Sequence, residues 1–515
     1  CVSFGLEKKI IHYICQLKLH HHTKQLPMEE LRNLEPGAVW KYFAEICQIP
    51  RPSKKEEQIL QYIQQFAGQH NLESKRDEAG NLLISKPATK GNERLKTVVL
   101  QSHVDMVGEK TRNTVHDFEK DAIRVYTDGD WVKAKGTTLG ADNGLGIAAQ
   151  LAVLESTDLN HGPLECLFTV DEETGLTGAF ALAPNFFEGK ILLNLDSEDW
   201  GELFIGCAGG MDTTATIGFD REKVPEEHLG FIISVTGIKG GHSGDEIHKG
   251  LGNALKIINR FLWNLSDHYD VKIASFDGGK ARNAIPREAE ARITVHEEDL
   301  ESVYAYFDSY HKEIANERKI TEPGLELALE QVNLPEYVID EDSQYDLLNA
   351  IYACPHGVYA WSREIEDLVE TSTNLAAIRT KENDTFYITT SQRSSVESAK
   401  SDIASMVDSV FRLGNARVEH SAGYPGWQPN TDSEILKITK DLYKELFHEE
   451  PKVKAIHAGL ECGLFLQKYP YLDMISIGPT IKGAHTPEER ASMQTTKAFW
   501  DLLVKVLENI PETTQ

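Results

Sequence analysis

The chain has 515 residues, with 80 acidic and 53 basic side chains and a net charge of −27. This length predicts more than one domain, and the acidic balance argues against nucleic acid or an anionic membrane as a partner. No apolar run approaches the roughly 18 residues that a membrane-spanning helix needs. The seven cysteines are scattered and form no CxxC pair. Such spacing indicates reduced thiols, so we expect a cytoplasmic protein.

The first 27 residues are set apart from the rest of the chain. They include His20, His21 and His22, and they lack the basic, apolar and small-residue order of a signal peptide. We therefore treat 1–27 as a leader, with its histidines in solvent, and expect the first domain to begin near Met28.

The next segment, 38–67, shows apolar residues at helical spacing, interrupted at 50–53. Ser53 and Glu56 predict a capping box at the start of the second helix. Strands are expected at 81–84 and 97–101. The latter is apolar and β-branched, like a buried parallel strand, and it is followed by His103 and Asp105. Side chains at the carboxyl ends of such strands face the crevice in which α/β proteins place their sites.

The same pattern continues after a short strand at 130–134. A glycine-rich loop carries Asp142, and 143–154 has the pattern of a helix. Buried strands are expected at 164–170, ending at Asp171, and at 190–195, ending at Asp196. Acidic or histidine side chains that follow several buried strands in order predict a single site.

The pattern of predicted elements changes near Gly209. From there to residue 390, strands and amphipathic helices follow one another in an α+β order, with an antiparallel sheet expected. We interpret 209–390 as one inserted domain of two related halves, although no sharp internal repeat is visible. Helices at 394–413, 435–447 and 496–510 and strands at 453–456 and 474–477 then resume the first pattern. The catalytic domain is therefore predicted in two parts, 28–208 and 391–515.

Hard ligands accumulate in the first and last parts. Structural zinc sites are closed and often use cysteine, whereas catalytic sites use histidine and carboxylate. Five such ligands with one shared carboxylate suit a two-metal hydrolase. Of the adjacent Glu172 and Glu173, one can bind a cation while the other acts as a general base. The candidate ligands are His103, Asp142, one residue of the Glu172–Glu173 pair, Asp196 and His485.

Three further residues have more limited roles in this interpretation. Asp105 lies two residues after His103 on the same side of the strand, where it can hold the other ring N–H. His242 lies between glycines in Gly240-Gly241-His242-Ser243-Gly244, so it can reach a substrate and polarise a carbonyl as an oxyanion-hole donor. Glu198, by contrast, is expected to be a bystander.

These motifs together resemble the M20 metallopeptidases, in the branch of the aminoacyl-histidine dipeptidases. The resemblance covers about 28–515, with all motifs in order. The motifs are Ser102-His103-Val104-Asp105, Gly140-Ala141-Asp142-Asn143, Asp171-Glu172-Glu173, Leu195-Asp196-Ser197 and the glycine-flanked His242. The resemblance implies an α/β fold with a central mixed sheet flanked by helices, as in zinc exopeptidases, and an inserted α+β lid domain.

The resemblance also implies roles for single residues. Asp142 would bridge two Zn²⁺ ions, although Mn²⁺ or Co²⁺ would also suit the ligands. His103 and Asp196 would complete one site, and Glu173 and His485 the other. The remaining implied roles are Glu172 as the general base that activates a metal-bound water, Asp105 as the residue that orients His103, His242 as the oxyanion donor, and Asn283, Arg393 and Gly459 as contacts for the substrate carboxylate.

The predicted function is that of a metal-dependent dipeptidase that hydrolyses unblocked dipeptides, including Xaa-His. Small peptides are then the expected partners. A hydrolase of N-acyl amino acids or a carboxypeptidase from the same family would use the same site residues. A binding protein with an inactive peptidase fold is a further alternative. An inserted domain of two halves would allow His242 to act within one chain, so both a monomer and a homodimer remain open.

Overall fold

The computed structural model describes residues 31 and 33–513, so the predicted leader lies outside the described residues. The chain forms two compact units. The first comprises Cys1–Ile205, Asn430–Lys454 and Leu464–Gln515, and the second comprises Gly206–Pro429 and Ala455–Gly463. Among the described residues, no helix combines the length and the apolar character needed to cross a membrane.

The first unit is built on an eight-stranded mixed sheet, as expected. The strands lie in the order β1-β2-β6-β3-β7-β23-β8-β22. Its central pairs β3–β6, β3–β7 and β7–β23 are parallel, whereas β1–β2, β2–β6 and β8–β23 are antiparallel. The strands are β1 (Glu73–Arg76), β2 (Leu82–Lys86), β3 (Val98–His103), β6 (Leu164–Thr169), β7 (Ile191–Asn194), β8 (Glu202–Cys207), β22 (Lys452–Ile456) and β23 (Asp473–Ser476).

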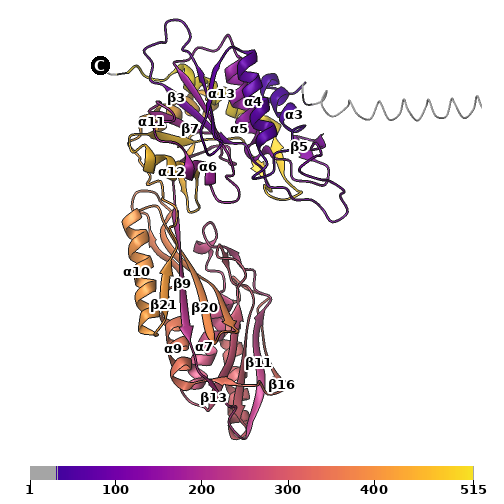
Figure 1. The fold of residues 1–515 in the computed structure, drawn as a ribbon, viewed down its shortest axis with the longest axis vertical. Helices are drawn as coiled ribbons and strands as arrows, with labels where there is room; N and C mark the ends of the chain where they lie inside the picture. The colour runs from indigo at the N-terminus through magenta and orange to yellow at the C-terminus, as the bar shows by residue number, and fades with distance from the viewer. Residues whose placement is uncertain (1–30, 32, 514–515) are drawn as a thin grey trace, which may run out of the picture. The chain divides into compact units, whose positions relative to one another are not determined.

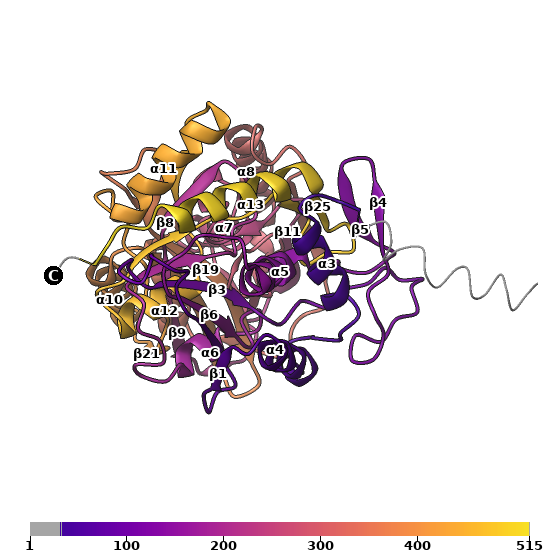
Figure 2. The same ribbon diagram turned by 90° about the horizontal axis from the view of Figure 1, so that it is seen from above.

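Helices pack against this sheet because its central strands are mostly apolar and are buried along their whole length. Every side chain of β3, β6 and β7 is buried. Helix α5 contacts both β3 and α3, and α11 contacts both β23 and α13; Figure 2 shows both helix pairs side by side. The helices are α3 (Gly37–Ile46), α4 (Glu57–Gln69), α5 (Ala141–Glu155), α6 (Thr177–Ala181), α11 (Glu434–Phe447), α12 (Glu461–Lys468) and α13 (Met493–Glu508).

A small four-stranded sheet joins distant parts of the first unit. Its order is β24-β25-β5-β4, from β4 (Val125–Asp128), β5 (Trp131–Ala134), β24 (Ile481–Lys482) and β25 (Arg490–Ser492). The β24–β25 loop contains His485, and the loop that follows β5 leads to Asp142. Pairing of β25 with β5 therefore brings two predicted ligand segments to the same region.

The predicted capping box at the start of the second helix is wrong. Helix α4 begins at Glu57, and no side chain caps its first turn. The Ser53 hydroxyl instead donates to Oδ2 of Asp105 at 2.8 Å. The Glu56 carboxylate accepts from the N–H groups of Lys54 and Asp171 at 2.6 and 3.2 Å. Both side chains thus bind loop segments and not the first turn of α4.

The second unit contains a nine-stranded sheet in which the pairings between named strands are antiparallel (Figure 1). The path is β16-β11-β15-β13-β19-β20-β9-β21, and β18 pairs with β19. The strands are β9 (Gly209–Gly218), β11 (His228–Thr236), β13 (Val271–Gly278), β15 (Ala289–His296), β16 (Glu326–Val332), β18 (Gly357–Trp361), β19 (Val369–Lys381), β20 (Thr385–Ser394) and β21 (Arg417–His420). The helices are α7 (Ala254–Ser266), α8 (Leu300–Arg318), α9 (Glu341–Ala353) and α10 (Glu397–Leu413).

This sheet consists of two halves with the same topology. Each half has the order β-α-β-β-α-β: β11-α7-β13-β15-α8-β16 in one, and β9-α9-β19-β20-α10-β21 in the other. In both, the fourth strand lies beside the first, then the third, then the second. The halves join where β13 meets β19. The first half is inserted between β9 and α9 of the second.

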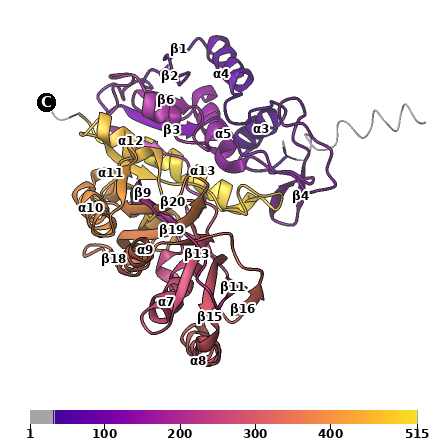
Figure 3. The same ribbon diagram turned by 60° about the horizontal axis from the view of Figure 1, so that its bottom comes forward.

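The nesting of the halves explains where the second unit ends. The sequence prediction placed the inserted domain at 209–390, whereas the unit runs from Gly206 to Pro429 and adds Ala455–Gly463. Helix α10 and strand β21 are the last two elements of the outer half. Val407 and Phe411 of α10 are buried in the same apolar core as the side chains of α7, α8 and α9. Figure 3 shows these helices beside the sheet.

Candidate functional site

The five predicted metal ligands come together in the first unit. His103 is the last residue of β3, Asp196 lies two residues after β7, and Glu173 follows β6 in a turn. Asp142 lies in the first turn of α5. His485 lies in the β24–β25 loop with a φ of 62°. Three of the five therefore lie at or after the carboxyl ends of strands of the large sheet, as the strand pattern predicted. Asp142 lies at the start of a helix.

Asp142 divides this set into two groups. Its Oδ1 lies 3.0 Å from Nε2 of His103, and that nitrogen lies 3.2 Å from Oδ1 of Asp196. Its Oδ2 lies 3.2 Å from Nε2 of His485, and that nitrogen lies 3.0 Å from Oε2 of Glu173. One carboxylate thus turns its two oxygens towards two separate pairs, each of one imidazole and one carboxylate.

The charges of this cluster perturb one another strongly. For His103, burial alone lowers the pKa, but Asp196, Asp105 and Asp142 together raise it well above its usual range. Hydrogen bonds to Asp142 and Glu173 raise the pKa of His485 to about 11. Burial, against the attraction of His103, raises the pKa of Asp196 to about 6. Burial would raise the pKa of Asp142, but His103 and His485 hold it far below its usual range. Nearby positive charge therefore stabilises the ionised form of this buried carboxylate.

The donors suit divalent cations. Ligand atoms of His103, Asp142 and Asp196 lie within 4.8 Å of one another, and the same holds for Asp142, Glu173 and His485. Oε1 of Glu173 is buried without a hydrogen-bond partner. Imidazole and carboxylate ligands in this number fit two cations such as Zn²⁺, Mn²⁺ or Co²⁺, with one carboxylate shared.

Asp105 connects the histidine to the glutamate pair. Its Oδ1 lies 3.4 Å from Nδ1 of His103 and accepts the N–H of Glu172 at 3.0 Å. Its Oδ2 accepts the N–H of Glu173 at 3.2 Å and the hydroxyl of Ser53. Burial would raise the pKa of Asp105, but His103 and these donors lower it to about 2. Asp105 is therefore a buried carboxylate that lies against the His103 ring and binds the turn with Glu172.

Three residues that the sequence interpretation missed also belong here. Glu198, expected to be a bystander, has its pKa raised to about 8 by burial and by Asp142 and Asp196. Glu489 and Arg51 are buried, and both bind the backbone of the segment that carries Asp142. The only sequence signal for Glu489 is its position four residues after His485, within a charged stretch that resembles a solvent-exposed loop.

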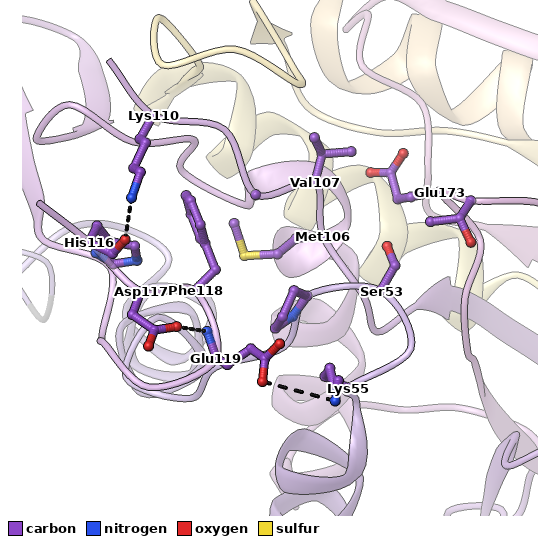
Figure 4. A pocket seen from close by; sticks show the side chains of 13 residues that line it. Ser53, Lys55, Met106, Val107, Lys110, His116, Asp117, Phe118, Glu119 and Glu173 are labelled. Carbon is purple, nitrogen blue, oxygen red and sulfur yellow. Dashed lines mark hydrogen bonds and ion pairs between the residues drawn. The ribbon is translucent and has the colours of Figure 1, made fainter. Parts of the chain in front are cut away.

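A cavity of about 680 Å³ opens beside the cluster in the same unit (Figure 4). Glu173 and Ser53 lie on one side of it, and Met106, Phe118 and Lys110 on the other. Lys110 donates to the backbone oxygen of His116 at 2.6 Å, which fixes the far wall. The cavity thus combines apolar side chains with charged ones next to a predicted ligand, and it can accept part of a small molecule.

His242 lies in the second unit. It forms the two-residue strand β12 (Gly241–His242) with β14 (Ala284–Ile285), opposite Ala284. The N–H groups of Gly244 and Asp245 donate to its Nδ1 at 3.3 and 3.1 Å, which favours a neutral ring with the proton on Nε2. The half-exposed carboxylate of Asp245 lies 3.3 Å from the same nitrogen.

The predicted carboxylate contacts also lie in the second unit. Arg393 is buried in β20; it donates to the hydroxyl of Tyr424 at 2.8 Å, and its Nε has no partner. A Cβ on Gly459 would lie 2.8 Å from the Tyr424 ring, so the glycine permits this close approach. Asn283 is exposed, and its backbone oxygen accepts the N–H of Ser243. Burial and Arg393 lower the pKa of nearby His457 to about 3.

Comparison with known families identifies the chain. Residues 99–509 match the model of peptidase family M20/M25/M40, which is more than half of the sequence. The chain belongs to this family. The resemblance inferred from the motifs is confirmed, and the protein is a peptidase by family.

Relatives match over nearly the whole chain. The "Cytosol non-specific dipeptidase" of Escherichia coli is 44% identical over 484 residues, which is 94% of this chain and 100% of that protein. The crystal structure of an aminoacylhistidine dipeptidase from Vibrio alginolyticus has a TM-score of 0.88 at 44% identity, covering 94% of this chain and 99% of the other. The aminopeptidase PepT of Bacillus cereus, at 16% identity and a TM-score of 0.55, covers 93% and 99%, and it shares the fold alone.

Proposed function

We propose that the protein is a metal-dependent dipeptidase that hydrolyses unblocked dipeptides, including Xaa-His. The observation that carries the proposal is the division of Asp142 between two imidazole–carboxylate pairs at 3.0 and 3.2 Å. The names and full-length coverage of the E. coli and V. alginolyticus relatives support the dipeptidase activity. The word "cytosol" in the first name supports a cytoplasmic location.

In this proposal the first unit carries the hydrolytic chemistry. His103 and Asp196 would hold one cation, Glu173 and His485 the other, and Asp142 would bridge them. When bound, the two cations supply Lewis-acid polarisation of the scissile carbonyl and lower the pKa of water. We assign zinc as the metal because two imidazoles and three carboxylates are ligands that it accepts.

Glu172 would then move the proton. Its carboxylate lies within 4.8 Å of ligand atoms of His103 and Glu173, and its N–H is fixed by Asp105 at 3.0 Å. We assign it as the general base that takes a proton from the attacking water and returns it to the leaving amine. Asp105 holds the turn in place while this proton moves.

The second unit would bind and polarise the substrate. The Nε2–H of His242 is a donor that can stabilise the oxygen of the scissile carbonyl as its negative charge develops. Arg393 has an Nε–H without a partner, so its guanidinium can bind the terminal carboxylate of a dipeptide, with the backbone of Gly459 and the side chain of Asn283 as further contacts.

The direct experiment is a panel of substrates offered to metal-free protein with and without added Zn²⁺. We expect zinc-dependent cleavage of Ala-His and Gly-Leu, and neither cleavage of a tripeptide nor release of acetate from N-acetyl-leucine. Cleavage of N-acetyl-leucine alone would assign the protein to the N-acyl amino acid hydrolases. Two bound metals with no cleavage of any compound would contradict the enzyme assignment.

A further inference from the structure

A single buried carboxylate binds the backbone of the segment that precedes and includes Asp142. Oε2 of Glu489 accepts the N–H groups of Leu139 and Gly140 at 2.7 and 3.0 Å. Its Oε1 accepts those of Ala141 and Asp142 at 2.8 and 3.4 Å. Glu489 is only 2% exposed. Four consecutive N–H groups thus converge on one side chain, although each would otherwise need its own partner.

A buried cation holds the same segment through a carbonyl group. Arg51, also 2% exposed, donates to the backbone oxygen of Gly140. Its other terminal nitrogen donates to the oxygens of Val104 and Asp105 at 2.9 and 2.7 Å. One guanidinium therefore joins the segment after His103 to the segment before Asp142.

The glycine at this point is required by that contact. Gly140 has a φ of +70°, and a Cβ on it would lie 2.7 Å from a terminal nitrogen of Arg51. A Cβ on Gly144 would lie 2.8 Å from the same nitrogen. Both glycines therefore leave room for the guanidinium, which explains why a glycine-rich stretch surrounds Asp142.

We infer that Glu489 and Arg51 are positioning residues that form a clamp across three ligand-bearing segments, 103–105, 139–142 and 485–489, and thereby set the metal affinity of the centre. Glu489 lies four residues from His485, so its bonds to 139–142 fix the separation of His485 from Asp142. Arg51 fixes the separation of Asp142 from His103. The inference rests on the proposed metal centre and adds residues that contact no ligand atom of that centre directly.

The physical reason is preorganisation. Asp142 must present both oxygens in opposite directions, so a small rotation of its backbone would misplace it for both cations at once. Residues that orient metal ligands typically change metal affinity or activity about 10–100-fold when they are replaced. A carboxylate that accepts four N–H groups cannot be replaced by an amide, because the amide –NH₂ would face two N–H donors.

The test is metal affinity in Glu489→Gln, measured without reference to activity. Metal-free protein is titrated with Zn²⁺ in competition with a chromophoric chelator. We expect wild type to bind two ions and the variant to bind at least one of them about 10–100-fold more weakly. Arg51→Met should weaken binding in the same way, because it releases the oxygens of Gly140 and Asp105.

Glu165→Gln is the matched control. Glu165 is also a buried carboxylate of the first unit, and it accepts the N–H groups of Glu188 and Gly189 at 2.8–3.1 Å. Its replacement carries a comparable folding cost but should leave zinc affinity unchanged. Thermal unfolding of the metal-free proteins tests whether each variant is folded. If Glu489→Gln is not folded, the zinc affinity of Glu489→Asp is measured in its place.

The outcomes separate the inference from the proposed function. Wild type that binds no zinc would overturn the metal centre itself. Wild type with two ions and a folded Glu489 variant of equal affinity would overturn only the clamp. An equal loss of affinity in Glu165→Gln would show that general destabilisation, rather than the clamp, controls binding.

Discussion

At the scale of single residues, Glu172 and Glu173 are neighbours with different expected roles. Oε2 of Glu173 lies 3.0 Å from Nε2 of His485, among the ligands, whereas Glu172 is assigned to move a proton. We expect Glu172→Gln to lower kcat for Gly-Leu by about 10²–10⁴-fold, because an amide cannot act as a base. Zinc content, measured by atomic absorption, should stay at two ions per chain.

Glu173→Gln is the comparison variant for this prediction. It should lose zinc from one site as well as activity, because it removes a charged ligand. If Glu172→Gln also loses zinc while its fold is intact, Glu172 is a ligand and the division of roles between the two glutamates is wrong.

Arg393 supports a second prediction about a single side chain. Hydrogen bonds to charged groups contribute about 1.5–3 kcal/mol, which corresponds to roughly 10–150-fold in binding. We therefore expect Arg393→Met to lower kcat/KM for Gly-Leu by about that factor, mainly through KM. The kcat/KM of the wild type should be lower for the C-terminal amide of Gly-Leu than for Gly-Leu itself, and the variant should have similar values for both.

The control for Arg393 is an arginine on the surface of the same unit. Arg412 is 66% exposed on α10 and pairs with Asp408 at 2.7 Å. Its replacement by methionine should leave both substrates unaffected. A variant at Arg393 that still discriminates acid from amide would remove this residue from carboxylate recognition.

The residues that the sequence predicted differ in kind from those it missed. His103, Asp142, Glu173, Asp196 and His485 are of residue types whose side chains can bind cations directly. Three of them, His103, Glu173 and Asp196, lie at the end of buried strands or shortly after them. Glu489 and Arg51 bind backbone groups instead. Every residue has an N–H or a C=O group, so the sequence carries no mark of which backbone these side chains will meet.

At the scale of elements, the loop that carries His242 is fixed at both ends by another buried glutamate. Glu322 follows α8 and is 2% exposed. Its two oxygens accept the N–H groups of Lys239 and Gly252 at 2.8 and 2.7 Å, on either side of the loop. We expect Glu322→Gln to loosen this loop and to lower kcat about 10-fold with little change in KM.

A double variant decides whether Glu322 acts through His242. His242→Ala with Glu322→Gln should be no slower than His242→Ala alone, because residues that act as a unit are not additive. Additive losses of kcat would mean that Glu322 does not act through His242. Full activity of His242→Ala would refute the role of His242 itself. Glu326→Gln, on the exposed side of β16, controls for the loss of charge.

The elements themselves were predictable where they are apolar and regular. Buried strands such as 98–103 and 164–169 contain short apolar runs, and the amphipathic helix at 254–266 has the 3.6-residue period. The edge strand at 73–76 was missed because all its residues are exposed and polar. Strand β21 was missed for the same reason, since three of its four residues are exposed.

At the scale of the whole molecule, the two units carry different sets of predicted site residues. All five predicted ligands lie in the first unit, and His242, Asn283, Arg393 and Gly459 lie in the second. The first unit is assembled from three chain segments, and His485 comes from the last of them. Bound metal would therefore tie the final segment to the first, across more than 280 intervening residues between Asp196 and His485.

This arrangement predicts where metal stabilises the protein. A ligand that binds only the folded state adds about 2.7 kcal/mol at a concentration 100 times its Kd. Because every ligand lies in the first unit, we expect chelation of the metal to accelerate hydrogen exchange in 98–105, 139–155, 191–196 and 481–493. Exchange in the sheet formed by β11, β13, β15 and β16 should change little.

Peptide-resolved hydrogen exchange of the metal-loaded and metal-free protein measures both responses in one sample. The β11–β16 half is the internal control, because its apolar core lies within the second unit and it contains no predicted metal ligand. Equal deprotection of both units would mean that they unfold as one cooperative body, so that metal affinity governs the stability of the whole chain. Deprotection confined to the first unit would show instead that the insertion between β8 and α11 keeps a stability of its own, as its separate core requires.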